Sequence, residues 1–294
     1  MPLLVLFALG LGVGTVVAVV AWRYPRTAGQ SATPALDTAA RKVGETVGRS
    51  PRLRAVLRAR LDPAVATGLA LTLALAFAIG GGVVLGVLAY LVRSHSLLVG
   101  LDSSVAKWGN RHASATSMHV LNAVTQLGSI SVVIVLCVVL AVVETLRERS
   151  VWVAPFIVAV MGGEELLTAT VKQLADRLRP TFNPAAATLG PSFPSGHSAT
   201  AAAFYATVAL LLGRWRGRRA RAVLAGLAVG IAVTVAASRV LLDVHWLSDV
   251  IAGLALGWAW FSICAIAFGG RILRFGAAAE QAARVADVAE RPVS

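Results

Sequence analysis

The stretch Ser238-Arg-Val-Leu-Leu-Asp-Val-His-Trp-Leu-Ser-Asp249 places charged and imidazole side chains at the junction of two long apolar runs, 222–242 and 247–269. A mainly apolar run of about 20 residues is typical of a membrane span. Ionisable residues are costly beside lipid, so a polar cluster where two spans meet indicates a functional site. The stretch therefore predicts a membrane protein with its chemistry at the ends of its spans.

Apolar runs of this kind recur along the whole chain. Of its 294 residues 57% are hydrophobic and 14% are charged, with a mean hydropathy of +0.76. A soluble domain would carry about 25% charged residues. A segment surrounded by lipid must satisfy its own backbone hydrogen bonds, so each span should be a helix. We predict an all-α, polytopic fold with seven spans, at 3–22, 63–92, 118–143, 151–172, 197–213, 222–242 and 247–269.

The net charge of +13 raises the question of a nucleic-acid partner. The basic residues form no single stripe and instead lie in the loops between apolar runs, which argues against that partner. With the predicted spans, 20 of the 27 Lys and Arg residues fall on one side of the membrane. The positive-inside rule then places the N-terminus outside, the C-terminus in the cytoplasm and the polar cluster at the extracytoplasmic face of the cell membrane.

The spans divide the chain into four parts: an N-terminal transmembrane helix (1–22), a basic cytoplasmic linker (23–62), a six-helix membrane domain (63–269) and a cytoplasmic tail (270–294). The first run lacks basic residues before it, which favours a retained anchor over a cleaved signal peptide. Two interpretations of the linker stay open, a basic amphipathic helix on the membrane surface and a solvated chain. Nothing in the sequence predicts an oligomeric state.

Two further polar segments interrupt the apolar pattern on the same predicted side as Ser238–Asp249. One runs from Lys172 to Arg179-Pro180 at the end of the fourth span, and the other is Pro194-Ser-Gly-His197 at the start of the fifth. Neighbouring spans can pack together, so we expect the three segments to converge at one end of the bundle.

The charges in these segments favour an anion. Lys172, Arg179 and Arg239 would repel one another near lipid unless they share a negatively charged ligand, and arginine binds phosphate in a bidentate manner. Ser195 and Gly196 lie at a predicted helix N-terminus, where free backbone N–H groups also attract anions. Three cations beside the start of a helix therefore predict a site for a phosphate dianion.

Two histidines flank the predicted anion site. His245 and Asp249 are four residues apart and therefore share a helix face. A carboxylate bound to one ring nitrogen leaves the other nitrogen free as a nucleophile. His197 can then serve as the acid for the leaving oxygen. A metal bound by these side chains is disfavoured, because the neighbouring cations would repel it, so no metal and no cofactor are predicted.

The three segments follow the pattern K-x6-RP, PSGH and SR-x5-H-x3-D without a mismatch. In this the chain resembles the type 2 phosphatidic acid phosphatase superfamily, over about 63–269. The resemblance implies a six-helix phosphatase core, with His245 as nucleophile, Asp249 as its partner and His197 as acid. It also implies phosphate binding by Lys172, Arg179, Ser195, Gly196 and Arg239, and a metal-free hydrolysis of a phosphorylated membrane lipid such as phosphatidic acid, phosphatidylglycerol phosphate or a polyprenyl pyrophosphate.

Two alternatives to a lipid phosphatase remain open from the sequence. The same site could transfer a phosphoryl group to an alcohol or sugar, as a lipid-linked phosphotransferase. A non-enzymatic transporter or scaffold is disfavoured by the complete set of catalytic side chains. Glu164 and Glu165, inside the fourth span, are interpreted either as support for Lys172 or as hydrogen-bonded packing residues.

Overall fold

The structure is a computed structural model that describes residues 1–28, 66–93, 97–148, 150–181 and 183–272. Most of the predicted linker and nearly all of the predicted tail lie outside these residues. Within them the fold is all-α with no strand, and seven helices are long and apolar enough to cross a membrane. The prediction of a polytopic bundle with seven spans is confirmed.

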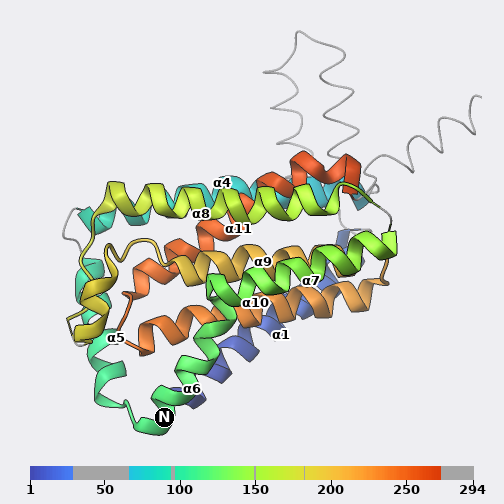
Figure 1. Ribbon diagram of the computed structural model, residues 1–294. Coiled ribbons are helices and arrows are strands. Elements are labelled where there is room, and N and C mark those ends of the chain that lie inside the picture. The colour runs from blue at the N-terminus through green and yellow to red at the C-terminus, as the bar shows by residue number, and fades with distance from the viewer. Residues whose placement is uncertain (29–65, 94–96, 149, 182, 273–294) are drawn as a thin grey trace, which may run out of the picture.

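The long helices run side by side through the bundle (Figure 1). In chain order the described elements are α1 (Pro2–Ala28), α4 (Ala66–Arg93), α5 (Leu97–Arg111), α6 (Ala115–Thr125), η1 (Gln126–Gly128), α7 (Ile130–Glu148), α8 (Val153–Ala175), η2 (Pro184–Leu189), α9 (Gly196–Gly213), α10 (Arg218–Leu241) and α11 (Leu247–Ile272).

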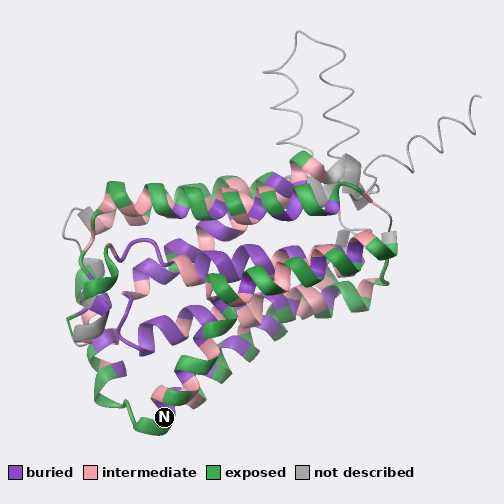
Figure 2. Ribbon diagram, viewed as in Figure 1, coloured by how far each residue is buried: buried purple, intermediate pink, exposed green. Residues whose placement is uncertain are grey.

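Helix α9 lies at the centre of the bundle and packs against α8, α10 and α11. Figure 2 shows it as one of the most buried helices. Its contact with α11 depends on two glycines, because a Cβ at Gly253 or Gly257 would collide with the backbone oxygen of Ser195 or Ala199. Helices pack this closely in membranes where small residues line the interface.

Helix α1 lies along α10 through a second set of glycines. A Cβ on Gly14 would come within 2.7 Å of the Gly226 oxygen, and one on Gly230 within 2.9 Å of the Gly10 oxygen. At the start of α1, Leu6 is fully buried in a cluster with Leu241 and Leu242, at the end of α10. The extra N-terminal span thus packs on the helix that carries Ser238 and Arg239.

The third predicted span, 118–143, was wrong at its start. The chain forms α6, then the short turn η1, and only then the spanning helix α7 from Ile130. The break coincides with a close contact, since a Cβ at Gly128 would lie 2.6 Å from Val235 Cγ1 and 2.7 Å from the backbone oxygen of His197. Helix α6 is therefore separate from the span, and its last residue, Thr125, reaches the α10 side chain Arg239.

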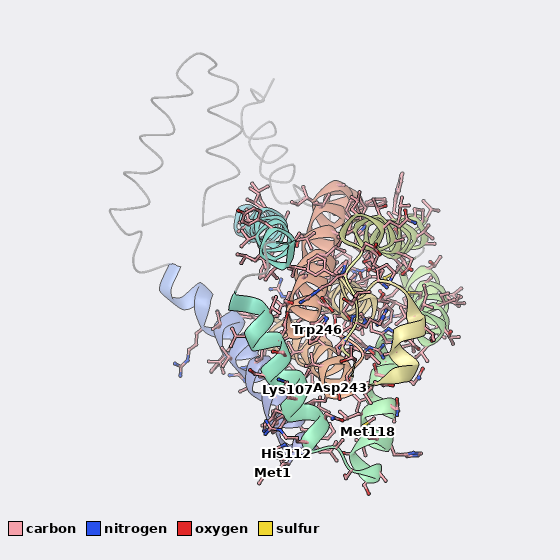
Figure 3. The ribbon with its side chains drawn as sticks, turned by 90° about the vertical axis from the view of Figure 1, so that its left-hand side faces the viewer. Met1, Lys107, His112, Met118, Asp243 and Trp246 are labelled. Atoms are coloured by element: carbon pink, nitrogen blue, oxygen red, sulfur yellow. The ribbon has the colours of Figure 1, made fainter. Side chains whose placement is uncertain are left out.

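The two ends of the bundle differ in chemistry. We call the end where α8 finishes and α9 and α11 begin the site end; helix α5 lies across it (Figure 3). At the opposite end Arg214, after α9, donates to the buried Glu144 of α7 at 2.8 Å. This ion pair joins the end of α9 to α7 at the end of the bundle that lies away from the three polar segments.

Candidate active site

The structure brings the three polar segments together at the site end. Arg179, in the loop after α8, donates to the backbone oxygen of Val244 at 2.8 Å. The backbone N–H of Ser195 donates to the backbone oxygen of Asp249 at 3.0 Å, which joins the start of α9 to the start of α11. All eight residues predicted for catalysis and phosphate binding lie on these segments.

His245 occupies the turn between α10 and α11, which also holds the labelled residues Asp243 and Trp246 (Figure 3). Its side chain is only 2% exposed. Its Nε2 lies 3.2 Å from Nη1 of Arg179, and its Nδ1 lies 3.5 Å from Oδ2 of Asp249. The guanidinium can only donate, so Nε2 is the acceptor and the ring proton is on Nδ1, facing the carboxylate.

Burial lowers the pKa of His245 to about 4, although the nearby Asp249 carboxylate opposes the shift. The 3.5 Å approach to Asp249 is longer than a good hydrogen bond, and Nδ1 has no hydrogen-bond partner among the described residues. The imidazole is therefore neutral near pH 7, with a lone pair on Nε2. This is the form that a nitrogen nucleophile requires.

Asp249 is fully buried in the first turn of α11, and both of its oxygens are hydrogen-bonded. Oδ1 accepts from Nη1 of Arg177 at 2.6 Å, and Oδ2 accepts from the backbone N–H of Trp246 at 2.9 Å. The second bond is that of an acidic residue in the first helical turn to the residue that caps the helix. The carboxylate is held in one orientation, with Oδ2 toward His245.

Arg179 is fixed by backbone carbonyls. In addition to Val244, the backbone oxygens of Gly190, Leu189 and Pro191 accept from it at 2.8, 3.4 and 3.2 Å. Burial lowers the pKa of this arginine from its usual value, while the charge of Asp249 opposes the shift. Its Nη1 points at Nε2 of His245, so the guanidinium lies beside the imidazole nitrogen that carries the lone pair.

Lys172 and Arg239 complete the positive cluster. A Cβ built on Gly196 would lie 3.7 Å from Nζ of Lys172, so the ammonium group lies next to the first residue of α9. Arg239 is buried and donates to Thr125, while its Nε has no partner among the described residues. A buried N–H group without a partner favours a ligand that accepts a hydrogen bond.

The remaining predicted residues lie at the start of α9. Ser195 is fully buried, and its hydroxyl oxygen accepts from Ser198 at 3.0 Å. His197 is half-buried, and the charges of Arg239 and Lys172 act on it. Among the described residues no group of three His, Cys, Asp or Glu side chains is arranged to hold a metal.

Sequence reasoning missed part of the site. Arg177, Ser248 and Asp102 are not among the predicted site residues, yet the three form a hydrogen-bonded network with Asp249. Thr125 was placed inside a span. The signal for Arg177 was weak, because it is one more basic residue beside Arg179.

The two intramembrane carboxylates have different environments. Glu164 is fully buried and accepts from Thr168 at 2.8 Å and from Thr200, on α9, at 3.1 Å. It is a hydrogen-bonded packing residue between α8 and α9. Glu165 is exposed on the surface of α8, within electrostatic reach of Lys172.

Comparison with known proteins finds relatives that match this part of the chain. A sequence model of the PAP2 superfamily matches residues 152–272, which include all three polar segments. Phosphatidylglycerophosphatase B of Bacillus subtilis (strain 168) is 34% identical over 143 residues, covering 47% of this chain and 68% of the relative. The chain belongs to the PAP2 superfamily. The prediction of the family from its three motifs is confirmed.

Other relatives of this PAP2 protein point the same way. The lipid A 1-phosphatase of Rhizobium etli is 35% identical over 122 residues, covering 38% of this chain and 48% of that protein. The crystal structure of a transmembrane PAP2-type phosphatidylglycerolphosphate phosphatase from Bacillus subtilis superposes with a TM-score of 0.60 at 28% identity. It matches 68% of this chain and 99% of the solved one. The predicted enzyme class, a membrane-embedded lipid phosphatase, is confirmed.

Proposed function

We propose that this PAP2 protein hydrolyses a phosphomonoester or pyrophosphate carried by a membrane lipid, through a phosphohistidine on Nε2 of His245. The observation that carries the proposal is the position of this neutral, buried imidazole between the guanidinium of Arg179 and the carboxylate of Asp249. The nucleophile, the carboxylate that orients it and a cation that can bind phosphate are thereby adjacent.

In the first step Nε2 of His245 attacks phosphorus, and the bond from phosphorus to the lipid oxygen breaks. With the negatively charged phosphate bound beside it, His197 carries a proton. It donates this proton to the leaving oxygen, so the lipid leaves as an alcohol or a shorter phosphate ester. Asp249 stabilises the positive charge that develops on the ring of His245. In the second step a water oxygen attacks phosphorus while His197 accepts a proton from that water, the phosphorus–nitrogen bond breaks, and His245 is restored as inorganic phosphate leaves.

The phosphate-binding groups are Lys172, Arg179, Arg239, Ser195 and the backbone of Gly196. The hydrogen bond from Nη1 of Arg179 to Nε2 of His245 must break when substrate binds. The N–H group then donates to a phosphate oxygen, and the lone pair on Nε2 faces phosphorus. The unused Nε of Arg239 supplies a further donor without breaking a bond. The cations would thus stabilise the charge on the transferring group.

We further propose that the six-helix unit 63–269 is the catalytic domain, that 1–22 is an added span, and that 23–62 and 270–294 are a cytoplasmic linker and tail. The distribution of basic residues supports an N-terminus outside and a site at the extracytoplasmic face. The lipid would enter sideways, with its tails in the bilayer and its phosphate at the site end.

The decisive experiment is phosphate release by the purified protein in detergent with excess EDTA. Phosphatidic acid, phosphatidylglycerol phosphate and a polyprenyl pyrophosphate are compared, with His245→Ala as the control. We expect release that survives EDTA and is abolished in the variant. Release that EDTA removes would refute the metal-free mechanism. Consumption of the lipid that requires an added alcohol or sugar, with the phosphoryl group recovered on that acceptor and not as free phosphate, would favour a phosphotransferase.

A further inference from the structure

Arg177 bridges two buried carboxylates at the site end. Its Nη1 donates to Oδ1 of Asp249 at 2.6 Å, and its Nη2 donates to Oδ2 of Asp102, on α5, at 2.7 Å. The arginine side chain is 12% exposed, and the two carboxylates are 0% and 2% exposed. Two carboxylates this deeply buried need a shared cation, because each would otherwise be an uncompensated charge.

Asp102 also binds the start of α11, the helix that carries Asp249. Its Oδ1 accepts from the backbone N–H of Ser248 at 2.9 Å, and its Oδ2 accepts from the hydroxyl of Ser248 at 2.6 Å. The first N–H groups of a helix have no partner within the helix. Asp102, on a different helix, therefore supplies the acceptor for the N–H of Ser248 in the first turn of α11.

Trp246, in the turn between α10 and α11 that also holds His245, contacts Arg177. The guanidinium carbon of Arg177 lies 5.4 Å from the centroid of the Trp246 ring, and the indole N–H donates to the backbone oxygen of Leu178 at 2.8 Å. Arg177 thus contacts the turn that holds His245, the helix that holds Asp249 and, through Asp102, the surface helix α5.

We propose that Arg177 and Asp102 are positioning residues, which together hold Asp249 toward His245 and couple the docking of α5 to the orientation of the nucleophile. The inference rests on the proposed function of His245 and Asp249. Arg177 is distinct from the phosphate-binding arginines, because its Nη1 and Nη2 groups are engaged by Asp249, Asp102 and Ser248. It acts on the reaction through Asp249 and does not contact the phosphate.

The kinetic test uses Arg177→Met and Arg177→Lys in the full-length protein. Misplacing a catalytic group by about 1 Å can cost roughly 100-fold in rate. We therefore expect Arg177→Met to lower kcat by about that factor, with the inhibition constant of inorganic phosphate unchanged, and Lys to restore part of the rate. A wild-type kcat in Arg177→Met would overturn the proposal, as would phosphate inhibition that weakens in step with kcat.

A double-variant cycle asks whether Arg177 acts through Asp249. If it does, Arg177→Met added to Asp249→Asn changes the residual kcat by no more than about twofold. Losses that multiply in the double variant would show that Arg177 acts elsewhere. Arg214→Met is the matched control, because it breaks a buried arginine–carboxylate pair at the opposite end of the bundle. It should lower the melting temperature without changing kcat.

Melting temperatures test the bridge independently of activity. Asp102→Asn should lower the melting temperature of the wild type and raise that of Arg177→Met, because in the variant it removes a buried charge without a partner. A decrease in both backgrounds would refute the bridge. If the wild type releases no phosphate, the proposed function fails and this measurement still decides the bridge. If the wild type is active and Arg177→Met is equally active, only the further inference fails.

Discussion

Arg179 and Arg239 differ in how much of their hydrogen-bonding capacity the protein already uses. Arg179 donates to several backbone carbonyls and to His245, so its position is set before substrate arrives. Arg239 bonds to Thr125 and keeps a buried Nε without a partner in the described chain. We infer that Arg179 fixes the geometry of the attack, and that Arg239 gains a partner when the phosphate binds.

At the same scale, the buried imidazole of His245 should make stability depend on pH. Its pKa falls from 6.5 in the unfolded chain to about 4 in the folded protein. Below pH 6.5 the unfolded chain therefore binds a proton that the folded protein does not, and the free energy of unfolding falls as pH falls toward 4. Between pH 7 and pH 5 the free energy of unfolding falls by roughly 2 kcal/mol because of His245. Above pH 7 His245 is neutral in both states and does not make stability depend on pH.

The measurement compares melting temperatures of wild type and His245→Asn in phosphate-free detergent buffer at pH 7 and pH 5. Other titrating groups are common to both proteins, so the difference between them isolates His245. The wild type should lose stability relative to the variant as pH falls. Parallel curves would contradict the assignment of a buried, neutral imidazole.

Charged residues beside lipid could be found from the sequence, because burying a charge near lipid costs free energy and therefore indicates a function. That argument located Lys172, Arg179, Arg239, His245 and Asp249, and the structure gathers them at one end. It could not locate Arg177 or Asp102. Their significance lies in two hydrogen bonds between positions more than 70 residues apart, and neither residue breaks a local pattern.

At the scale of elements, the spacing of α9 and α11 should be intolerant of a single methyl group. Gly253→Ala would place a Cβ against the backbone oxygen of Ser195, the residue whose N–H bonds to the Asp249 oxygen. Backbone cannot move aside as a side chain can, so we expect a loss of roughly 1–3 kcal/mol in stability. Activity should fall with it.

Thermal unfolding and phosphate release, measured together, check this prediction. Gly82→Ala on α4 is the control, because no atom lies within 4 Å of its added Cβ. The control should retain both stability and activity. An alanine at position 253 that leaves both unchanged would mean that α9 and α11 can separate without disturbing the site.

Element boundaries set by tertiary contact were beyond the sequence. Hydrophobicity placed all seven spans, but it continued the third span through α6 and η1. The chain breaks there because Gly128 lies against the backbone of His197. The hydropathy of a segment reports its preference for lipid over water. It does not report contact with a helix almost 70 residues away, which here sets the boundary.

At the scale of the whole molecule, the orientation of the bundle is a prediction. Lys107, on α5, and Arg216, between α9 and α10, are both exposed and lie at opposite ends. In a variant with Cys137 and Cys264 replaced by alanine, a cysteine at position 107 should react with a membrane-impermeant maleimide added to intact cells. A cysteine at position 216 should react only after the cells are broken. The reverse pattern would place the site in the cytoplasm.

The central place of α9 has a consequence for how the protein is made. Of the seven candidate spans among the described residues, α9 is the least apolar and has the largest buried share, whereas α1 is the most apolar. During synthesis α1 can partition into the bilayer unaided and remain there until α10 emerges. Helix α9 gains much less from lipid alone, so we infer that the insertion machinery must retain it until α8 and its later neighbours shield it. Synthesis arrested just after α9 should therefore yield chains that are poorly integrated and readily degraded.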